Sequence, residues 1–141
     1  MKDQSKPIDS FFVYGTLKRG QCREAMWPRQ PLQVQPARCQ GMLWGRQDYP
    51  AMMPGQHQVL GELWTFAISQ LATVRAALDR IEGTTNNAAD DLYHCHPVTV
   101  VRLADESTHQ AYAYFYNRNP AADGFQAIEP IDDCQQWKAN A

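Results

Sequence analysis

The strongest periodic pattern along the chain is helical, because apolar residues recur at intervals of three and four positions. They are Leu71, Val74, Leu78 and Ile81. This spacing places one apolar stripe along an amphipathic helix. Ser69 is a suitable N-cap, and Gly83 is the residue type that commonly ends a helix. The pattern therefore predicts one helix that starts after Ser69 and stops at Gly83.

Period-two alternation and short apolar runs predict the strands. Residues 58–66 alternate, and Glu62 falls on an otherwise apolar face with Trp64. Residues 93–103 and 110–117 form two more strands, joined by a connection of hairpin length. Their order does not alternate as strand–helix–strand, which argues against a parallel sheet.

Two further segments read as extended chain. A short apolar run precedes Gly15, and residues 32–46 are extended, with an interruption at Pro36 and bulges or bends at Gly41 and Gly45. Five strands with one good helix predict an α+β fold. We expect a small, mostly antiparallel β-barrel with one or two flanking helices.

Other segments carry weaker patterns. Residues 21–27 read as a short helix or an irregular turn that ends at Pro28. Residues 49–55 combine turn residues with apolar side chains, so we expect a loop that packs against the protein. Residues 84–91 are polar and read as mobile, and no element is assigned beyond residue 120.

Length and composition narrow the class of protein. A chain of 141 residues suits one domain, with a core at about 11–117 and loose ends. A net charge of −2 gives no general attraction to nucleic acid or to an anionic membrane. Residues 1–10 are polar, unlike a signal peptide, and no apolar run approaches the ~20 residues of a membrane span. We therefore expect a cytoplasmic protein.

Cysteines and histidines offer weak metal signals. The four cysteines have no C-x-x-C spacing, so free thiols are favoured over a zinc or redox pair. His94 and His96 share one strand face, which is compatible with a metal site. No third ligand is evident, so two half-exposed strand histidines are the better interpretation, and we predict no metal.

The loop after the first strand could bind an anion. Gly15 permits a sharp turn that aims backbone N–H groups into one concavity, where they can hold an anion or a developing oxyanion. A plain tight turn is the alternative. Gly15 and Gly20 match the start of a phosphate-binding loop, but Gln21 and Cys22 stand where lysine and Ser/Thr are required. Nucleotide hydrolysis is therefore not supported.

Two glutamates are candidates for proton transfer. Glu82 ends the predicted helix, where the negative end of the helix dipole disfavours the ionised carboxylate. A general base is tuned in this direction. An exposed glutamate at a helix end is the alternative, and the residues alone favour it. Glu62 ranks second. If its side chain is buried, it needs hydrogen-bonding partners, and the sequence identifies none. The alternative is that Glu62 lies at a sheet margin with its carboxylate in water.

Five motifs follow one another along the chain. They are Tyr-Gly-Thr-Leu at 14–17, Tyr-Pro-Ala with Pro-Gly at 49–55, Val-Leu-Gly-Glu-Leu-Trp at 59–64, Leu-Asp-x-x-Glu-Gly at 78–83, and an aromatic strand at 112–117. Together they resemble the γ-glutamylcyclotransferase-like (AIG2-like) family in order and spacing. The chain departs from this pattern at Cys95, where relatives often carry arginine, and at 133–137, where a Gly-Asp-Trp motif is absent.

The resemblance implies a small barrel with a cavity at the Tyr-Gly-Thr-Leu loop. It also implies a reaction in which the α-amine of a γ-glutamyl group attacks its own γ-carbonyl, releasing an amine and 5-oxoproline. Because the ring closure is intramolecular, we expect neither a cofactor nor a covalent nucleophile.

Roles for individual residues follow from the same resemblance. Glu82 is the expected general acid/base, and Gly15, Thr16 and Leu17 supply backbone N–H groups. Tyr14 and Tyr116 are the expected pocket-lining hydrogen-bonders. The resemblance thus implies a substrate-binding set that consists of Tyr14, Gly15, Thr16, Leu17 and Tyr116.

The expected partner is a small γ-glutamyl compound, and we expect a monomer or weak homodimer. The alternative is a non-catalytic module of the same fold that binds a small molecule or a peptide end.

Overall fold

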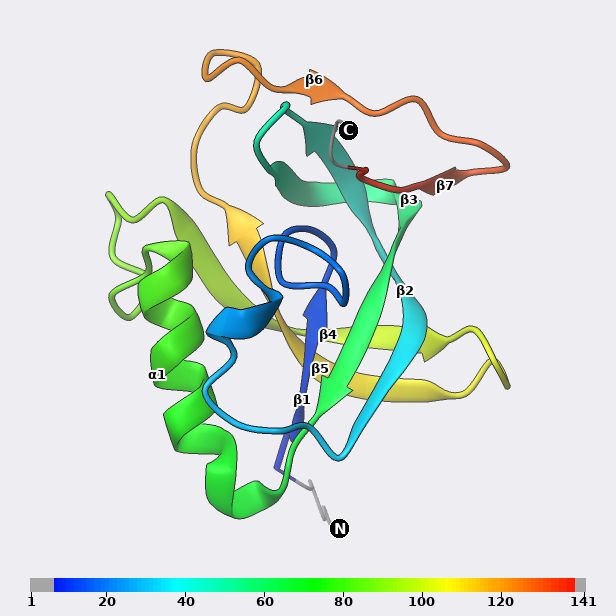
Figure 1. Cartoon of the computed structure of the whole chain (residues 1–141). Helices are drawn as coiled ribbons and strands as arrows, with labels where there is room; N and C mark the ends of the chain where they lie inside the picture. The colour runs from blue at the N-terminus through cyan, green and yellow to red at the C-terminus, as the bar shows by residue number, and fades with distance from the viewer. Residues whose placement is uncertain (1–6, 139–141) are drawn as a thin grey trace, which may run out of the picture.

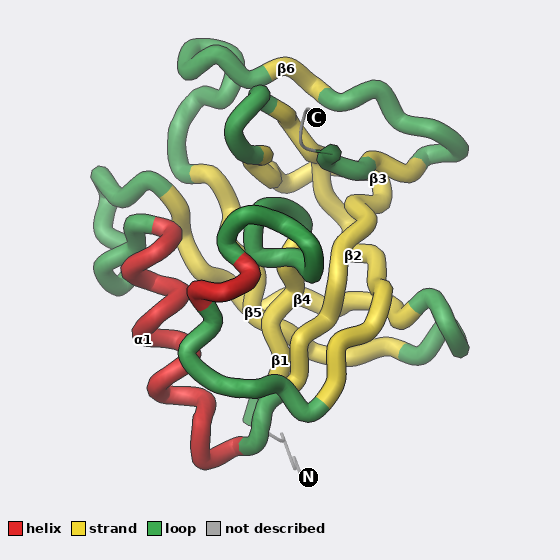
Figure 2. Tube along the Cα trace, in the orientation of Figure 1, coloured by secondary structure: helices red, strands yellow, loops and turns green. Residues whose placement is uncertain are grey.

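The structure is a computed structural model that describes residues 7–138. Its elements run in the order β1 (Ser10–Val13), η1 (Glu24–Met26), β2 (Gln33–Gly45), β3 (Pro50–Thr65), η2 (Ile68–Gln70), α1 (Leu71–Glu82), β4 (Tyr93–Arg102), β5 (Thr108–Tyr116), β6 (Gln126–Ala127) and β7 (Cys134–Gln135). The η elements are single turns of 3₁₀-helix, and η1 lies in the region where a short helix or turn is predicted (Figure 1, Figure 2).

Five strands close into a barrel. Antiparallel pairs join β1 to β3, β3 to β2, β2 to β4 and β4 to β5. The barrel closes through a parallel contact between β1 and β5, where Phe11 lies opposite Tyr112. One helix, α1, packs against the outside (Figure 1). The predicted fold class is confirmed, with one parallel pair in an otherwise antiparallel barrel.

Alternation along the strands divides the buried residues into two clusters. One cluster includes Phe12, Leu43 and Leu63 and fills the barrel. The other includes Phe11 and Trp64 and packs against the apolar face of α1. Because successive strand residues point to opposite faces, the two clusters draw on the same strands. Burial of each large apolar side chain contributes roughly 1.5–3 kcal/mol.

The helix ends where the sequence predicts and begins differently. Gly83 adopts the left-handed conformation (φ 74°). Its N–H donates to the Arg80 carbonyl, and the Thr84 N–H donates to the Asp79 carbonyl, which is the Schellman arrangement. The prediction that Ser69 caps the helix is wrong, because Ser69 lies within η2 and the N-cap position is Gln70, without a side-chain capping bond.

The predicted loop at 49–55 is instead largely strand. Pro50 begins β3, and Ala51 and Met52 are fully buried, so the expected packing is present. The register between β2 and β3 shifts at Gly41 and Met42, leaving three extra residues on β3. The prolines and glycine therefore mark a strand start and a bulge, which use the same residue types as a turn.

The C-terminal segment belongs to the fold. With β6 and β7 it crosses one end of the barrel (Figure 1). Phe125, Gln135 and Trp137 are buried, so the core extends beyond the predicted limit at residue 117. The expectation of a loose N-terminal end falls on residues 1–6, which lie outside the described residues.

The polar segment at 84–91 is an organised connection. The Asp91 carboxylate accepts hydrogen bonds from the N–H and hydroxyl of Thr85 and from the Ala88 N–H. These bonds hold the pKa of Asp91 below its usual range. The Asn87 amide bonds to both backbone groups of Cys95.

The four cysteines are free, as predicted. Among the described residues, the one α-helix is neither long nor apolar enough to cross a membrane.

Candidate active-site cavity

A cavity of about 100 Å³ lies between the end of α1 and the loop that follows β1. A cavity of about 10–15 Å³ is enough to hold one water molecule, so this cavity is large enough for a ligand the size of an amino acid. It is lined by Phe12, Val13, Tyr14, Gly15, Thr16, Leu17, Arg23, Tyr49, Pro50, Ile81, Glu82, Leu92, Tyr93 and Tyr114. The structure thus brings together the predicted residues Glu82 and Tyr14 to Leu17.

The carbonyl groups of the loop are held by the protein. The Gly15 carbonyl accepts from the Lys18 N–H (3.1 Å), and the Thr16 carbonyl accepts from the Arg23 N–H (2.8 Å). In a trans peptide the next N–H points the opposite way. The N–H groups of Thr16 and Leu17 are therefore turned away from these donors, and neither has an acceptor among the described residues. They are free to bind an anion.

The loop lies unusually close to the opposite wall. A Cβ atom added to Gly15 would lie 2.6 Å from Cγ of Pro50. Glycine is required here for this close approach, and the turn itself does not need a positive φ. Pro50 also lines the cavity, so the contact fixes its width at this point.

Glu82 is the last residue of α1, and the Schellman bonds around Gly83 fix where its side chain starts. Burial raises the pKa of Glu82 to about 7, and the positive charge of Arg23 opposes this rise. Within residues 7–138, no residue donates a hydrogen bond to the Glu82 carboxylate. A pKa of about 7 suits a group that exchanges a proton with a ligand near neutral pH.

Three tyrosines line the cavity with their hydroxyl groups already bound to the protein. Tyr14 donates to the Tyr114 carbonyl (2.5 Å) and accepts from the Met52 N–H (3.3 Å). Tyr93 donates to the Pro50 carbonyl (2.9 Å), and Tyr114 donates to an Asp79 carboxylate oxygen (2.5 Å). Burial raises the pKa of each of them. They form the walls and leave Glu82 as the group that titrates near pH 7.

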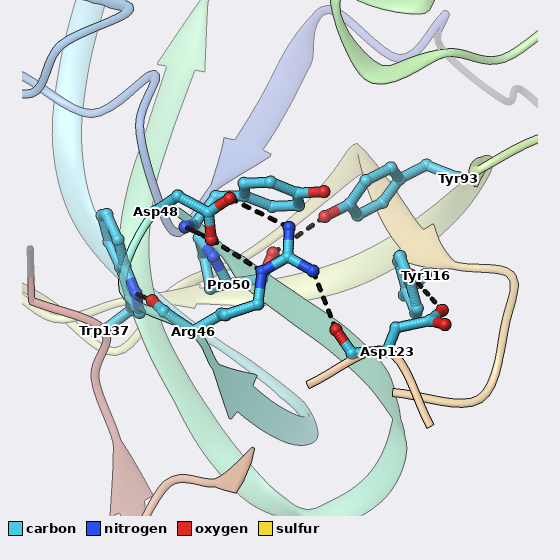
Figure 3. A network of polar contacts seen from close by, with 8 residues as sticks. Arg46, Asp48, Pro50, Tyr93, Tyr116, Asp123 and Trp137 are labelled. Atoms are coloured by element: carbon cyan, nitrogen blue, oxygen red, sulfur yellow. Dashed lines mark hydrogen bonds and ion pairs between the residues drawn. The ribbon is translucent and has the colours of Figure 1, made fainter. Parts of the chain in front are cut away.

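Tyr116 lies away from the lining of this cavity. Its hydroxyl donates to the Asp123 carboxylate (2.5 Å), and its ring packs edge-on against Tyr93. Figure 3 shows this bond within a larger network, in which Arg46 binds the Asp48 carboxylate and the Asp123 carbonyl. The structure therefore does not bring Tyr116 to Glu82, although it places Tyr116 behind one wall of the cavity.

The rival acid, Glu62, has partners that the sequence did not indicate. Its Oε1 atom accepts from the Arg19 backbone N–H (2.9 Å) and from the Trp64 indole N–H (3.1 Å). Glu62 is not among the residues that line the cavity. It anchors the distal part of the loop that follows β1.

His94 and His96 border a separate, open hollow of about 580 Å³. The Nε2 atom of His94 lies 2.7 Å from the Ala88 carbonyl oxygen, so this bond orients the ring. Within residues 7–138, no group of three or more histidines, cysteines or acids is placed to hold a metal ion.

Several lining residues were not singled out from the sequence. Arg23 lies in the short segment before η1, and Leu92 follows the polar connection after α1. Tyr114 lies in the aromatic strand at 112–117 and belongs to the same buried cluster as Tyr116. Arg23 and Leu92 carried no sequence signal, because contacts between loops distant in sequence have no periodic pattern.

The chain was compared with known proteins by sequence and by structure. The sequence model of the family described as "Gamma-glutamyl cyclotransferase, AIG2-like" matches residues 11–139. A comparison with curated proteins gives no match.

Solved structures show the same fold. An AIG2-like protein from Mus musculus has a TM-score of 0.61 at 21% identity, covering 95% of this chain and 99% of that one. YkqA from Bacillus subtilis has a TM-score of 0.59 at 21% identity, covering 85% of this chain but only 37% of that one. A protein called gamma-glutamyl cyclotransferase has a TM-score of 0.51 at 16% identity, covering 84% and 69%.

The family match spans the barrel, the loop after β1, the end of α1 and the C-terminal segment. The chain belongs to the gamma-glutamyl cyclotransferase, AIG2-like family.

Proposed function

We propose that the protein cyclises a γ-glutamyl group and releases 5-oxoproline and a free amine. The observation that carries this proposal is that Glu82 and the Gly15–Leu17 loop line one cavity. An acid/base group and unpaired backbone donors thus lie within reach of one small ligand. Because the γ-glutamyl amine and carbonyl belong to the same molecule, holding them in a reactive conformation can lower the barrier by roughly 7–11 kcal/mol.

Glu82 carries protons from the substrate α-ammonium to the leaving amine. Its carboxylate takes a proton from the substrate α-ammonium, and the resulting amine attacks the γ-carbonyl carbon to form the ring C–N bond. The carbonyl oxygen becomes an oxyanion. When it collapses, Glu82 returns the proton to the leaving nitrogen as the bond between that nitrogen and the ring carbon breaks. The ring nitrogen still carries a second proton, which passes to the freed Glu82 carboxylate and from there to the released amine or water, leaving neutral 5-oxoproline. A pKa of about 7 suits both steps at neutral pH.

The loop stabilises the oxyanion. The N–H groups of Thr16 and Leu17 have no acceptor among the described residues, and both residues line the cavity. Donors fixed in this way before the reaction need no reorganisation as charge develops. The loss of one such donor in other enzymes costs on the order of 10²–10³ in turnover.

The experiment that tests the proposal is incubation of the protein with a panel of γ-glutamyl amines, γ-glutamyl amino acids and γ-glutamyl-ε-lysine. Formation of 5-oxoproline is measured against a blank without protein. Turnover of at least one compound supports cyclisation. Saturable binding of a small acid with no product from any compound supports the alternative of a non-catalytic binding module.

A further inference from the structure

Arg23 is the cation of an otherwise largely apolar cavity. Among the described residues that line it, Arg23 and Glu82 are the two that carry a charge near neutral pH. Their neighbours include Val13, Ile81 and Leu92. A guanidinium beside apolar surface attracts an anion more strongly than one in water, because the local dielectric constant is lower.

Most other arginines of the described residues already have partners. Arg38, Arg46, Arg75 and Arg102 pair with carboxylates. Arg29 and Arg118 donate to uncharged oxygens. The remaining three are Arg19, Arg23 and Arg80, and of these Arg23 alone lines the cavity. Within residues 7–138, the Arg23 guanidinium forms no ion pair and no side-chain hydrogen bond.

The backbone of Arg23 is fixed to the anion-binding loop. Its N–H donates to the Thr16 carbonyl (2.8 Å). The indole N–H of Trp27, which follows η1, donates to the Leu17 carbonyl (2.9 Å). The segment that carries Arg23 is therefore joined at two points to the loop whose residues Gly15, Thr16 and Leu17 line the cavity. Its side chain is half-buried.

We propose that the Arg23 guanidinium is the receptor for a carboxylate of the ligand that occupies this cavity. Guanidinium and carboxylate groups match in a planar, two-bond arrangement. If Arg23 holds the carboxylate, the N–H groups of Thr16 and Leu17 remain free for the oxyanion. The identity of the ligand as a γ-glutamyl compound rests on the proposed function. Binding of a carboxylate by Arg23 does not depend on it.

A substrate offers this carboxylate in two places. One is the α-carboxylate of the glutamyl group, and the other is a carboxylate on the leaving amine. Both present the same chemistry to Arg23. A γ-glutamyl compound with an uncharged leaving group carries only the first, so paired substrates separate the two.

The direct test measures binding without turnover. We expect wild-type protein to bind 5-oxoproline more tightly than its uncharged carboxamide in a calorimetric or NMR titration. Arg23→Gln should weaken the binding of 5-oxoproline roughly 10- to 100-fold and abolish the preference for the acid. Arg19→Gln is the matched control, because Arg19 lies on the same loop without lining the cavity, and it should bind like wild type.

Two results would rule out the α-carboxylate as the group that Arg23 holds. One is equal binding of the acid and the carboxamide by wild-type protein. The other is wild-type affinity for 5-oxoproline in an Arg23→Gln variant whose circular dichroism shows that it is folded. Absence of turnover by the wild type would contradict the proposed reaction and would leave this binding test intact.

Kinetics with paired substrates then locate the carboxylate. If Arg23 holds the α-carboxylate, Arg23→Gln raises KM for all γ-glutamyl compounds by a similar factor. If it holds the leaving group, KM rises only for compounds whose amine carries a carboxylate. An unchanged KM for both kinds would contradict a role for Arg23 in holding a carboxylate.

Discussion

Gly15 lies so close to Pro50 that no side chain fits between them, since an added Cβ would be 2.6 Å from Cγ and 2.7 Å from Cδ of the proline ring. Both residues line the cavity. The proline ring is rigid, so a larger residue at position 15 must displace the loop and its N–H groups.

Gly15→Ala should therefore reduce turnover on the order of 100-fold, because misplacement of about 1 Å has such effects. Overpacking should also cost roughly 1–3 kcal/mol of stability. Gly20→Ala is the control: its φ of 82° makes alanine unfavourable by about 1–2 kcal/mol, but nothing crowds the position. Steady-state kinetics and urea unfolding measure both. Normal turnover in Gly15→Ala would show that the contact does not set the loop position.

The raised pKa of Glu82 makes stability depend on pH. Between its reference value of 4.5 and about 7, the native state holds a proton that the unfolded state has released. The free energy of unfolding therefore falls as the pH rises through this range, by at most about 3 kcal/mol.

Glu82→Gln removes this dependence. The variant should gain stability relative to wild type between pH 5 and pH 8, as measured by urea unfolding at each pH. A difference between the two proteins that stays constant over this range would show that Glu82 has an ordinary pKa.

Gln135 joins the C-terminal segment to the barrel. Its side-chain Oε1 accepts from the Leu43 N–H (2.7 Å), and its Nε2 donates to the carbonyls of Leu43 (3.1 Å) and Ile128 (2.6 Å). Gln135→Leu leaves the buried Leu43 N–H without its acceptor, although the Leu43 carbonyl keeps the bond from the Ile128 N–H (3.0 Å). The substitution should cost roughly 1–3 kcal/mol. The exposed Gln136→Leu should change stability by no more than about 0.5 kcal/mol. Equal stability of the two variants would argue against a structural role for the segment.

A Tyr116 variant distinguishes direct contact with the substrate from structural support of the cavity wall. Its hydroxyl binds Asp123, so Tyr116→Phe should lower stability by about 1 kcal/mol. The value of kcat/KM should stay within about threefold of wild type. A large rise in KM with unchanged stability would instead support direct contact of Tyr116 with the substrate.

The sequence predicted those features that depend on local periodicity. The stripe from Leu71 to Ile81 defined α1, and Gly83 marked its end. Residues 93–103 and 110–117 were predicted as two strands with a connection of hairpin length, and they correspond to β4 and β5. Turn residues were less informative, since Pro50 and Gly55 lie in a strand start and a bulge.

Features that depend on contacts between distant segments were not accessible in this way. The partners of Glu62 come from Arg19 and Trp64, and the place of Arg23 in the cavity depends on the path of the loop after β1. Motif resemblance brought Glu82 and Gly15 together in the hypothesis. Periodicity alone favoured an exposed glutamate at position 82.

The central claim is that Glu82 carries the proton for cyclisation. Its most direct test is the turnover of a γ-glutamyl substrate by Glu82→Gln, with the exposed Glu129→Gln as the matched control and circular dichroism to confirm folding. We predict that Glu82→Gln reduces kcat on the order of 10²–10⁴ and that Glu129→Gln leaves it unchanged. A folded Glu82→Gln protein that forms 5-oxoproline at the wild-type rate would contradict the account.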